Sequence, residues 1–433
     1  MNKLFLYALL ILSGILLAFA CQKKGDVQDP EIEITQPESN SYFSVPDSIH
    51  VKADIRDNEN IKWVQLSLVN KDQTPVAATK TIQPIDRKEY HLDTYYHVED
   101  ILLNSGEYYM QVRVSDGTNT RNGLKKVYIN EAERKLKYFL IVTASNPNQV
   151  SLYSLDSSGS KNYITSEPID YFASTFHSRN QQLIIAGKSV YGVKAFHAKD
   201  YQKAWNFQAS GNPVGSYFRA LTKTEENILL GIYNGEIIEI NKSGNKIRTY
   251  DSNNNLFSYQ LLKTENFLIA AQQDVPANKQ FITSFFPDWG GVHNQQFSNF
   301  KSKALYPMGP KEVLIPGNYN NQGGIWQYDL TSLTLWKARS ISQGKIHTSC
   351  QISDNDYLIA GNNQIYWYQV HINSLTTWKQ NTSVDKIYYD ELTNSVITVN
   401  GQKLRFLDFP IPTLKDETNF SENIHAVHPV YNK

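Results

Sequence analysis

Short stretches in which apolar and polar residues alternate run from Glu31 to about Ile129, separated by turn residues such as Ser105-Gly106. Residues 49–55 and 108–114 show the alternation most clearly. A period of two is typical of β-strands that have one buried face. Short strands over roughly a hundred residues predict a β-sandwich, which we place at residues 31–131.

The predicted sandwich resembles the bacterial immunoglobulin-like and fibronectin-type modules. Trp63 falls on its third strand, and Gly106-Glu107-Tyr108 puts a tyrosine where these families have their tyrosine corner. The antibody variant is excluded because the segment contains no pair of cysteines. A charged linker, residues 131–135, follows the sandwich.

A different pattern, a three-residue apolar core, recurs seven times after residue 135, at spacings of 38 to 46 residues. Such a period is typical of four-stranded propeller blades. We therefore predict an all-β chain in which a seven-bladed β-propeller occupies residues 136–433. The central residues of the seven cores are Leu140, Ile184, Leu229, Leu268, Leu314, Leu358 and Val396.

The first repeat lacks a strand that the other six have. Each later repeat has an additional strand ahead of its core, whereas the core at Phe139 follows the linker directly. The last apolar segment, residues 423–430, is the only one left to fill that place. Because open sheet edges invite aggregation, we predict that this segment closes the propeller as the innermost strand of the first blade.

Three repeats place a tryptophan after a matched turn. Here the chain resembles the quinoprotein-like propellers, which share the propeller fold with WD40 repeats, although the turn glycine of that family is replaced. The resemblance implies that the tryptophans pack between neighbouring blades. The tryptophans are Trp205, Trp336 and Trp378, and the replacing residues are Tyr201, Leu333 and Leu375.

The amino terminus has the layout of a secretory signal at residues 1–20, with Lys3 ahead of a long apolar run. A transmembrane helix is the alternative, because the run is nearly long enough to span a bilayer. Ala18-Phe19-Ala20-Cys21 resembles the lipobox of bacterial lipoproteins, which implies cleavage before Cys21 and lipidation, palmitate included, of that residue. Gln22 stands at the position where an inner-membrane retention signal has an aspartate, so the outer membrane is favoured. Residues 21–30 are polar and form a tether.

Composition narrows the function classes. The chain has 42 Lys+Arg against 42 Asp+Glu, which argues against binding along nucleic-acid phosphates. Its two cysteines exclude a disulfide framework and a multi-cysteine metal site, and Cys350 is expected to be a buried thiol. No nucleophile elbow, phosphate-binding loop or dinucleotide fingerprint occurs, so we predict no catalytic residue and no cofactor.

The residues at the starts of the innermost strands form the candidate binding site. In a propeller these positions meet at one end of the central channel. Cationic and aromatic side chains there suit an anionic or hydroxyl-rich ligand, although an idle, water-filled channel mouth is the alternative. The predicted positions are Ala173, Arg219, Tyr259, Lys303, His347, Tyr388 and His425.

Two patterns suggest metal sites only weakly. His425 and His428 are three residues apart, which on a strand directs them to opposite faces, so no shared metal is expected. Residues 57–60 with Asp116 are rich in oxygen ligands that calcium prefers, but a solvated turn is the commoner meaning of such a cluster.

These observations favour a non-enzymatic binding or scaffold lipoprotein of the envelope, whose propeller face binds a protein or glycan. One alternative is a propeller enzyme, a polysaccharide lyase using Arg219, His347 and Tyr388 or, less well supported because no predicted position is acidic, a hydrolase. Another is an assembly factor for outer-membrane complexes. The quinoprotein resemblance does not itself imply a dehydrogenase, because one fold hosts many functions.

Overall fold

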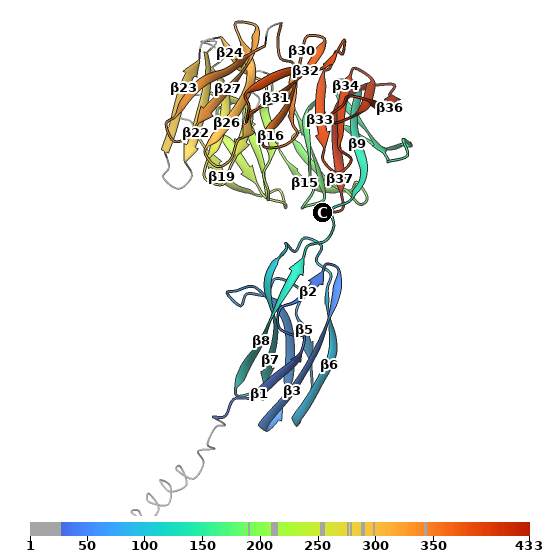
Figure 1. Ribbon diagram of the computed structural model, residues 1–433, viewed down its shortest axis with the longest axis vertical. Coiled ribbons are helices and arrows are strands. Elements are labelled where there is room, and N and C mark those ends of the chain that lie inside the picture. The colour runs from blue at the N-terminus through green and yellow to red at the C-terminus, as the bar shows by residue number, and fades with distance from the viewer. Residues whose placement is uncertain are drawn as a thin grey trace, which may run out of the picture. The chain divides into compact units, whose positions relative to one another are not determined.

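The structure is a computed structural model of the 433-residue chain (Figure 1). It describes residues 27–433 except 189–190, 209–214, 252–255, 275–276, 278, 287–290, 298 and 342–343, so the predicted signal and Cys21 lie outside the described residues. The chain divides into two compact units, residues 1–133 and 134–433. All regular elements of the described residues are strands, and none of these residues forms a helix able to cross a membrane.

Unit 1 has two β-sheets. The first has the order β1 (Glu31–Gln36), β3 (Asp47–Ile61), β6 (Arg87–Val98). The second has the order β2 (Ser41–Ser44), β8 (Thr120–Asn130), β7 (Gly106–Ser115), β4 (Trp63–Val69), β5 (Lys80–Ile82). Alternate residues of both sheets, such as Val51, Leu66 and Val112, are fully buried in one core.

Tyr108 occupies a corner of unit 1. Its hydroxyl donates a hydrogen bond to the carbonyl of Asn104, 3.0 Å away and four residues earlier in the chain. Burial raises the pKa of this hydroxyl. A partly buried tyrosine whose hydroxyl bonds a backbone carbonyl a few residues earlier has the hydrogen bond of a tyrosine corner.

Unit 2 forms seven antiparallel sheets from its described residues. Sheets one to three are β37 (Asn423–Tyr431), β9 (Leu136–Asn146), β10 (Gln149–Leu155), β11 (Lys161–Pro168); β12 (Tyr171–His177), β13 (Gln182–Gly187), β14 (Val193–His197), β15 (Lys203–Phe207); and β16 (Phe218–Lys223), β17 (Ile228–Ile232), β18 (Ile237–Ile240), β19 (Lys246–Tyr250).

The fourth sheet is β20 (Phe257–Lys263), β21 (Leu268–Asp274), β22 (Lys279–Phe286), β23 (Gly291–Phe297). In the fifth, β24 (Phe300–Ser302) and β25 (Tyr306–Pro307) both pair with β26 (Glu312–Tyr319), followed by β27 (Gln322–Asp329) and β28 (Thr334–Ser340). Sheets six and seven are β29 (Thr348–Gln351), β30 (Asp356–Gly361), β31 (Gln364–Gln369), β32 (Ser374–Gln380), and β33 (Lys386–Asp390), β34 (Ser395–Asn400), β35 (Lys403–Asp408), β36 (Leu414–Asn419).

The predicted apolar cores form the second strands of these sheets. All seven central residues, Leu140, Ile184, Leu229, Leu268, Leu314, Leu358 and Val396, are fully buried. These strands are apolar on both faces because a sheet lies on either side of each. The sequence period therefore located one fully buried strand position in every repeat.

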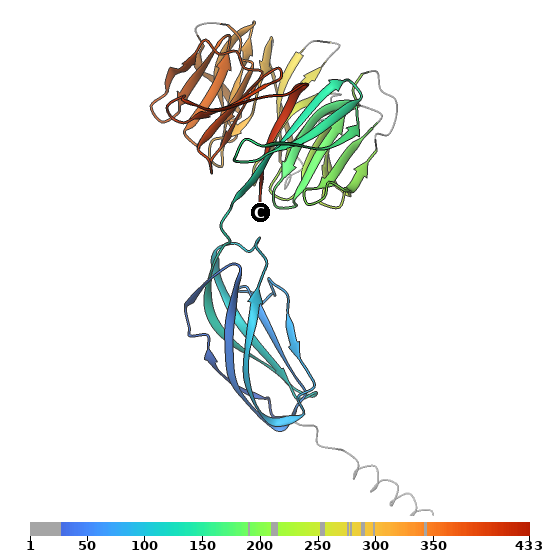
Figure 2. The same ribbon diagram turned by 90° about the vertical axis from the view of Figure 1, so that its right-hand side faces the viewer.

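The carboxyl-terminal strand completes the first sheet. β37 pairs antiparallel with β9, with Val427 opposite Ile141 and Val430 opposite Tyr138, as the repeat pattern predicted. In Figures 1 and 2 this red strand lies beside the blue-green β9. Segments from opposite ends of unit 2 thus share one sheet.

Neighbouring sheets contact one another through their first strands. Contacts join β37 to β12, β12 to β16, β16 to β20, β29 to β33 and β33 to β37. Hydrogen bonds complete the series: the Ser302 hydroxyl lies 3.2 Å from that of Tyr259, and the Tyr306 hydroxyl lies 3.0 Å from that of Ser349. The sheet order therefore returns to its beginning, which is a propeller-like arrangement.

Two of the three repeated tryptophans pack as predicted. Trp205 and Trp378 are buried, and their indole nitrogens donate to Gln182 and to the carbonyl of Pro410. The prediction was wrong for Trp336, which is 41% exposed. The cause is a two-residue shift relative to the bulge of the strand. Trp378 is the extra residue of the bulge in β32 and Trp205 directly follows the bulge in β15, whereas Trp336 comes two residues before the extra residue in β28. The left-handed turn residues Leu333 (φ 55°) and Asn373 (φ 45°) show the same shift.

Candidate functional site

A β-bulge occurs at the start of the first strand in six of the seven sheets of unit 2. The extra residue is Phe172 in β12, Arg219 in β16, Tyr259 in β20 and His425 in β37. In sheets six and seven two successive residues face one partner, since the amides of His347 and Asp385 donate to the carbonyls of Ala360 and Val399, which pair with Thr348 and Lys386. In sheet five the first strand is divided into β24 and β25, and the amide of Lys303 between them donates to the carbonyl of Pro316. Bulges redirect side chains and occur next to functional sites.

Cationic side chains gather at this end of the strands, which we call the mouth. We define the mouth cluster as Lys188, Arg219, Lys303, Lys345, Lys386 and His425. Arg219, Lys303, Lys386 and His425 are half-buried, whereas Lys188 and Lys345 are exposed. Six of the seven sheets or the loops next to them contribute one member each, so the charge is distributed around the ring.

His425 lies close to Tyr171 and to two other members of the cluster, Lys188 and Lys386. Its ring centroid is 5.0 Å from that of Tyr171. Burial lowers the pKa of His425, and the positive charges of Lys386 and Lys188 lower it further. Burial also lowers the pKa of Lys386, an effect that the neighbouring Asp385 opposes.

Arg219 is held over an aromatic ring. Its guanidinium carbon lies 4.8 Å from the ring centroid of Phe257, the first residue of β20. Its Nε atom is buried and has no hydrogen-bond partner among the described residues. Burial lowers the pKa of the guanidinium. A buried donor without an acceptor is costly, and in native proteins it calls for an explanation.

Lys303 and His347 occupy the same level in sheets five and six. Burial lowers the pKa of Lys303, as do the charges of Lys301 and Lys345. His347 is exposed, and its Nε2 lies 2.9 Å from the side-chain oxygen of Asn362. Like-charged lysines are thus close enough to destabilise one another.

The two predicted tyrosines lie in different places. Tyr259 is at the bulge of β20, and its hydroxyl lies 3.2 Å from that of Ser302. Tyr388 pairs with Ile397, further along its strand than the bulge, and burial raises its hydroxyl pKa. At the mouth level of β33 the residues are Asp385 and Lys386. Ala173 likewise follows the bulge of β12 and pairs with Ala186.

Sequence reasoning therefore missed Lys386, Lys188 and Lys345. A bulge adds one residue to six of the seven first strands, and its place shifts between sheets, so alignment from the apolar cores alone misplaces the mouth positions. The charged pair Asp385-Lys386, directly ahead of the buried Ile387, is the signal that would have located the start of β33.

The cations of the mouth cluster form no ion pair with any residue that the structure describes. Among the described residues, the ion pairs of unit 2 use other cations, namely Arg134, Arg179, Lys194, Lys263, Lys403, Arg405 and Lys415. The nearest carboxylates already accept backbone hydrogen bonds, Asp170 from Lys188 and Asp385 from Gly401. The mouth is therefore positively charged overall.

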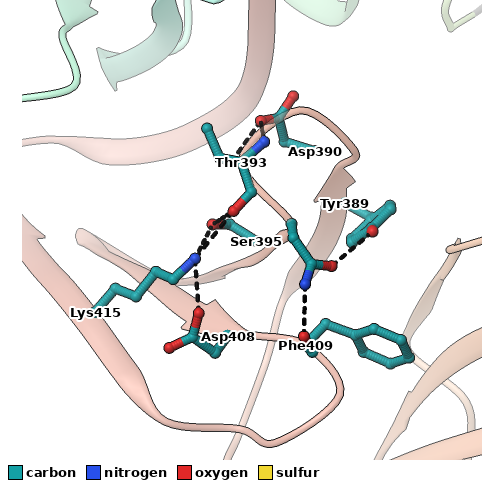
Figure 3. A network of polar contacts seen from close by, with 8 residues as sticks. Tyr389, Asp390, Thr393, Ser395, Asp408, Phe409 and Lys415 are labelled. Carbon is teal, nitrogen blue, oxygen red and sulfur yellow. Dashed lines mark hydrogen bonds and ion pairs between the residues drawn. The ribbon is translucent and has the colours of Figure 1, made fainter.

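The opposite ends of the same sheets have a different character. Asp390, at the end of β33, is fully buried and accepts hydrogen bonds from Thr393 (Figure 3). It also accepts one from the hydroxyl of Tyr431. In the same figure Lys415 contacts Asp408 at 2.7 Å and Ser395 at 3.1 Å. The polar groups of this network satisfy one another, which is the behaviour of a structural network, whereas the buried Nε2 of His177, at the same end of β12, has no partner among the described residues.

A second histidine lies deeper along β37. The Nε2 atom of His428 is 2.8 Å from the Ser174 hydroxyl, which in turn is 3.0 Å from that of Tyr171. Burial lowers the pKa of His428 to about 3, and Lys223 adds to the effect. A serine beside such a weak base is not activated as a nucleophile at neutral pH.

The oxygen-rich segment of unit 1 is used for local structure. Asp57 accepts from the amide of Glu59, and Asp116 accepts from the amides of Thr118 and Asn119. No group of three or more histidine, cysteine or acidic side chains within the described ranges is placed to hold a metal ion. In unit 2, the Cys350 thiol is buried, which raises its pKa.

Two cavities lie away from the mouth. One of about 180 Å³ lies between the first and seventh sheets, lined by Phe139, Leu155, Phe406 and Lys415 among others. The other, of about 470 Å³, is lined by the turns that contain Glu225 and Glu265. Neither contains a residue of the mouth cluster.

Comparisons with known proteins yield only distant likenesses. Neither a protein-family model nor a curated protein sequence matches the chain. A solved quinoprotein alcohol dehydrogenase-like protein from Bacteroides thetaiotaomicron is similar over 93% of this chain and 99% of its own, at 11% identity and a TM-score of 0.49.

Two further solved structures are less similar in extent. Sqt1 from Saccharomyces cerevisiae covers 67% of this chain and 88% of its own length, with 13% identity and a TM-score of 0.47. The Cps50 (Swd1) β-propeller domain from Myceliophthora thermophila covers 59% and 89%, with 10% identity and a TM-score of 0.46. At these values no activity, ligand or partner carries over to this chain, which is all-β with propeller-like neighbours.

Proposed function

We propose that the chain is a lipid-anchored binding protein of the bacterial outer membrane. In this proposal unit 1 is an immunoglobulin-like sandwich, and unit 2 is a seven-bladed propeller closed by β37 whose mouth binds a protein or glycan. The corner hydrogen bond of Tyr108 supports the first assignment, and the closed series of seven sheets supports the second. The anchor rests on the segment Ala18-Phe19-Ala20-Cys21.

The observation that carries the binding role is the mouth cluster itself. A fold under selection for stability alone does not benefit from half-buried cations that repel one another and form no ion pairs. Sites that cost stability are expected where function requires them. Arg219, Lys303 and Lys386 at the mouth are half-buried cations of this kind.

The enzymatic alternatives gain no specific support. His347 and Tyr388, the groups considered for a lyase, have separate partners, Asn362 for the first and the backbone of Val427 for the second. The mouth carboxylates Asp170 and Asp385 both hold backbone amides, whereas a glycosidase needs two carboxyl groups that face the substrate.

Binding at the mouth is tested with a matched pair of triple variants. The mouth variant is Arg219→Gln, Lys303→Gln and Lys386→Gln. The control variant is Lys199→Gln, Lys242→Gln and Lys246→Gln, which removes the same charge from exposed positions away from the mouth. We expect immobilised wild type and control to retain the same envelope protein or arrayed glycan, and the mouth variant to lose it. Equal retention by all three would refute binding at the mouth.

The anchor is tested separately by mass spectrometry of the mature protein from membranes. We expect acyl chains on Cys21. An unmodified Cys21 or an uncleaved amino terminus would refute the anchor without bearing on the mouth.

A further inference from the structure

We infer that the mouth cluster binds the anionic groups of an acidic polysaccharide, carboxylates or sulfates, carried at intervals along the chain. This inference rests on the proposed function, which makes the mouth a binding surface, and it adds the chemical class of the ligand. It follows from the sign, spacing and environment of the charges at the mouth.

The half-buried cations of the mouth cluster have no ion-pair partner among the described residues. Arg219, Lys303 and Lys386 are half-buried, so water compensates their charge less well than it does on an open surface. Arg219 in addition has a buried Nε without an acceptor among the described residues. An anion bound here would gain charge-assisted hydrogen bonds and relieve the repulsion among the cations.

The cations of the mouth cluster are distributed around the ring of sheets. Members of the cluster come from six different sheets, with His425 from the first, Arg219 from the third and Lys386 from the seventh. A single small anion contacts only adjacent members. A polymer with repeated negative charges can follow the ring and contact several of them, and the resulting avidity exceeds the affinity of any one contact.

The amide and aromatic groups of the mouth favour a sugar chain over an acidic protein segment. Amide and aromatic groups lie between the cations, including Asn362 beside His347, Phe257 beneath Arg219 and Tyr171 beside His425. Amide groups suit the many hydroxyls of a sugar ring, and aromatic rings offer it an apolar face. An acidic protein is the competing ligand, and the test below separates the two.

The test uses pairs of polysaccharides that differ in charge alone. Polygalacturonate is compared with its fully methyl-esterified form, and dextran sulfate with dextran, by titration calorimetry with the whole mature protein. We expect the charged member of at least one pair to bind and its neutral counterpart not to bind. Affinity should fall steeply as salt rises from 50 to 200 mM, because each ion contact at the mouth is screened.

The triple variants locate the site. We expect the mouth variant to bind the charged polysaccharide at least tenfold more weakly and with a shallower dependence on salt. The control variant should bind as the wild type does. Circular dichroism and thermal unfolding check that both variants are folded.

The outcomes separate the inference from the proposed function. Equal binding of charged and neutral chains, or undiminished binding by the mouth variant, would overturn the inference alone. So would the absence of polysaccharide binding together with capture of a protein that the mouth variant fails to retain. If the mouth variant changes no binding of any kind, both the inference and the proposed function fail.

Discussion

The two ends of the first strands in unit 2 differ in how their polar groups are partnered. At the mouth, Arg219, Lys303 and Lys386 are half-buried cations with no ion pair to any described residue. At the opposite end, buried Asp390 is held by Thr393 and Tyr431. The same architecture therefore stabilises one end and leaves charge available at the other.

The contrast is strongest beside Glu239. This buried carboxylate accepts hydrogen bonds from Lys263 at 2.6 Å, Asn227 at 2.8 Å and Tyr250 at 3.0 Å. These bonds lower its pKa although burial acts in the other direction. Substitutions at the two ends should consequently have opposite signatures, with loss of stability at one and loss of binding at the other.

The largest effect is expected from removing β37, which contributes to both ends through His425 and Tyr431. A chain that stops after Glu422 exposes the edge of β9 and loses buried Val427 and Val430. We expect it to lose cooperative unfolding in calorimetry, because an open edge and an incomplete core remain. A chain that lacks only Lys433 is the control, and retention of the full transition by the shorter chain would show that closure is dispensable.

The next largest effect is expected from Glu239→Ala. It leaves Lys263 without its ion-pair partner in a partly buried position, and such losses cost roughly 3–5 kcal/mol. Urea unfolding gives the change in free energy, and the exposed Glu225→Ala serves as the control. A loss below about 1 kcal/mol would mean that the opposite end is not a stabilising network.

Acid pH should destabilise the protein through His428. Its pKa is about 3 in the folded state and 6.5 when unperturbed, so between these values the unfolded chain binds more protons. Stability is therefore complete above pH 6.5 and falls as the pH decreases toward 3, by on the order of 2 kcal/mol from pH 6.5 to 5.

Urea unfolding across that range measures the slope, and His428→Gln should make it shallower. Buried His177, whose pKa is lowered to about 4, contributes in the same direction. An unchanged slope in His428→Gln would show that this histidine does not titrate as the structure implies.

The smallest effect on stability is expected from the mouth variant. Removing mutually repelling, half-buried cations should leave the free energy of unfolding within about 1 kcal/mol of wild type, or raise it. Calorimetry in low salt measures the difference. Destabilisation as large as that of Glu239→Ala would assign the mouth cations to the structure of unit 2 instead of to binding.

Pattern reasoning located the seven buried cores and the pairing of the last segment with the first sheet, because burial imposes a regular period on the sequence. Three of the residues that it placed at strand starts, Arg219, Tyr259 and His425, are bulge residues in the structure. It misplaced Trp336 and did not find Lys386, because turn lengths and bulges change the register by one or two residues without altering the apolar pattern. The missing ion pairs of the mouth depend on three-dimensional neighbours, which no local pattern reports.

The claim that the mouth cations have no ion-pair partner among the described residues is tested most directly by thermal unfolding in sodium sulfate and in sodium chloride of equal ionic strength. Sulfate stabilises most proteins by exclusion from their surface, so the control variant provides the reference. We predict that sulfate raises the Tm of wild type and control equally and that of the mouth variant by a smaller amount, because only the first two bind the anion at the mouth. An identical rise in all three proteins would contradict the account.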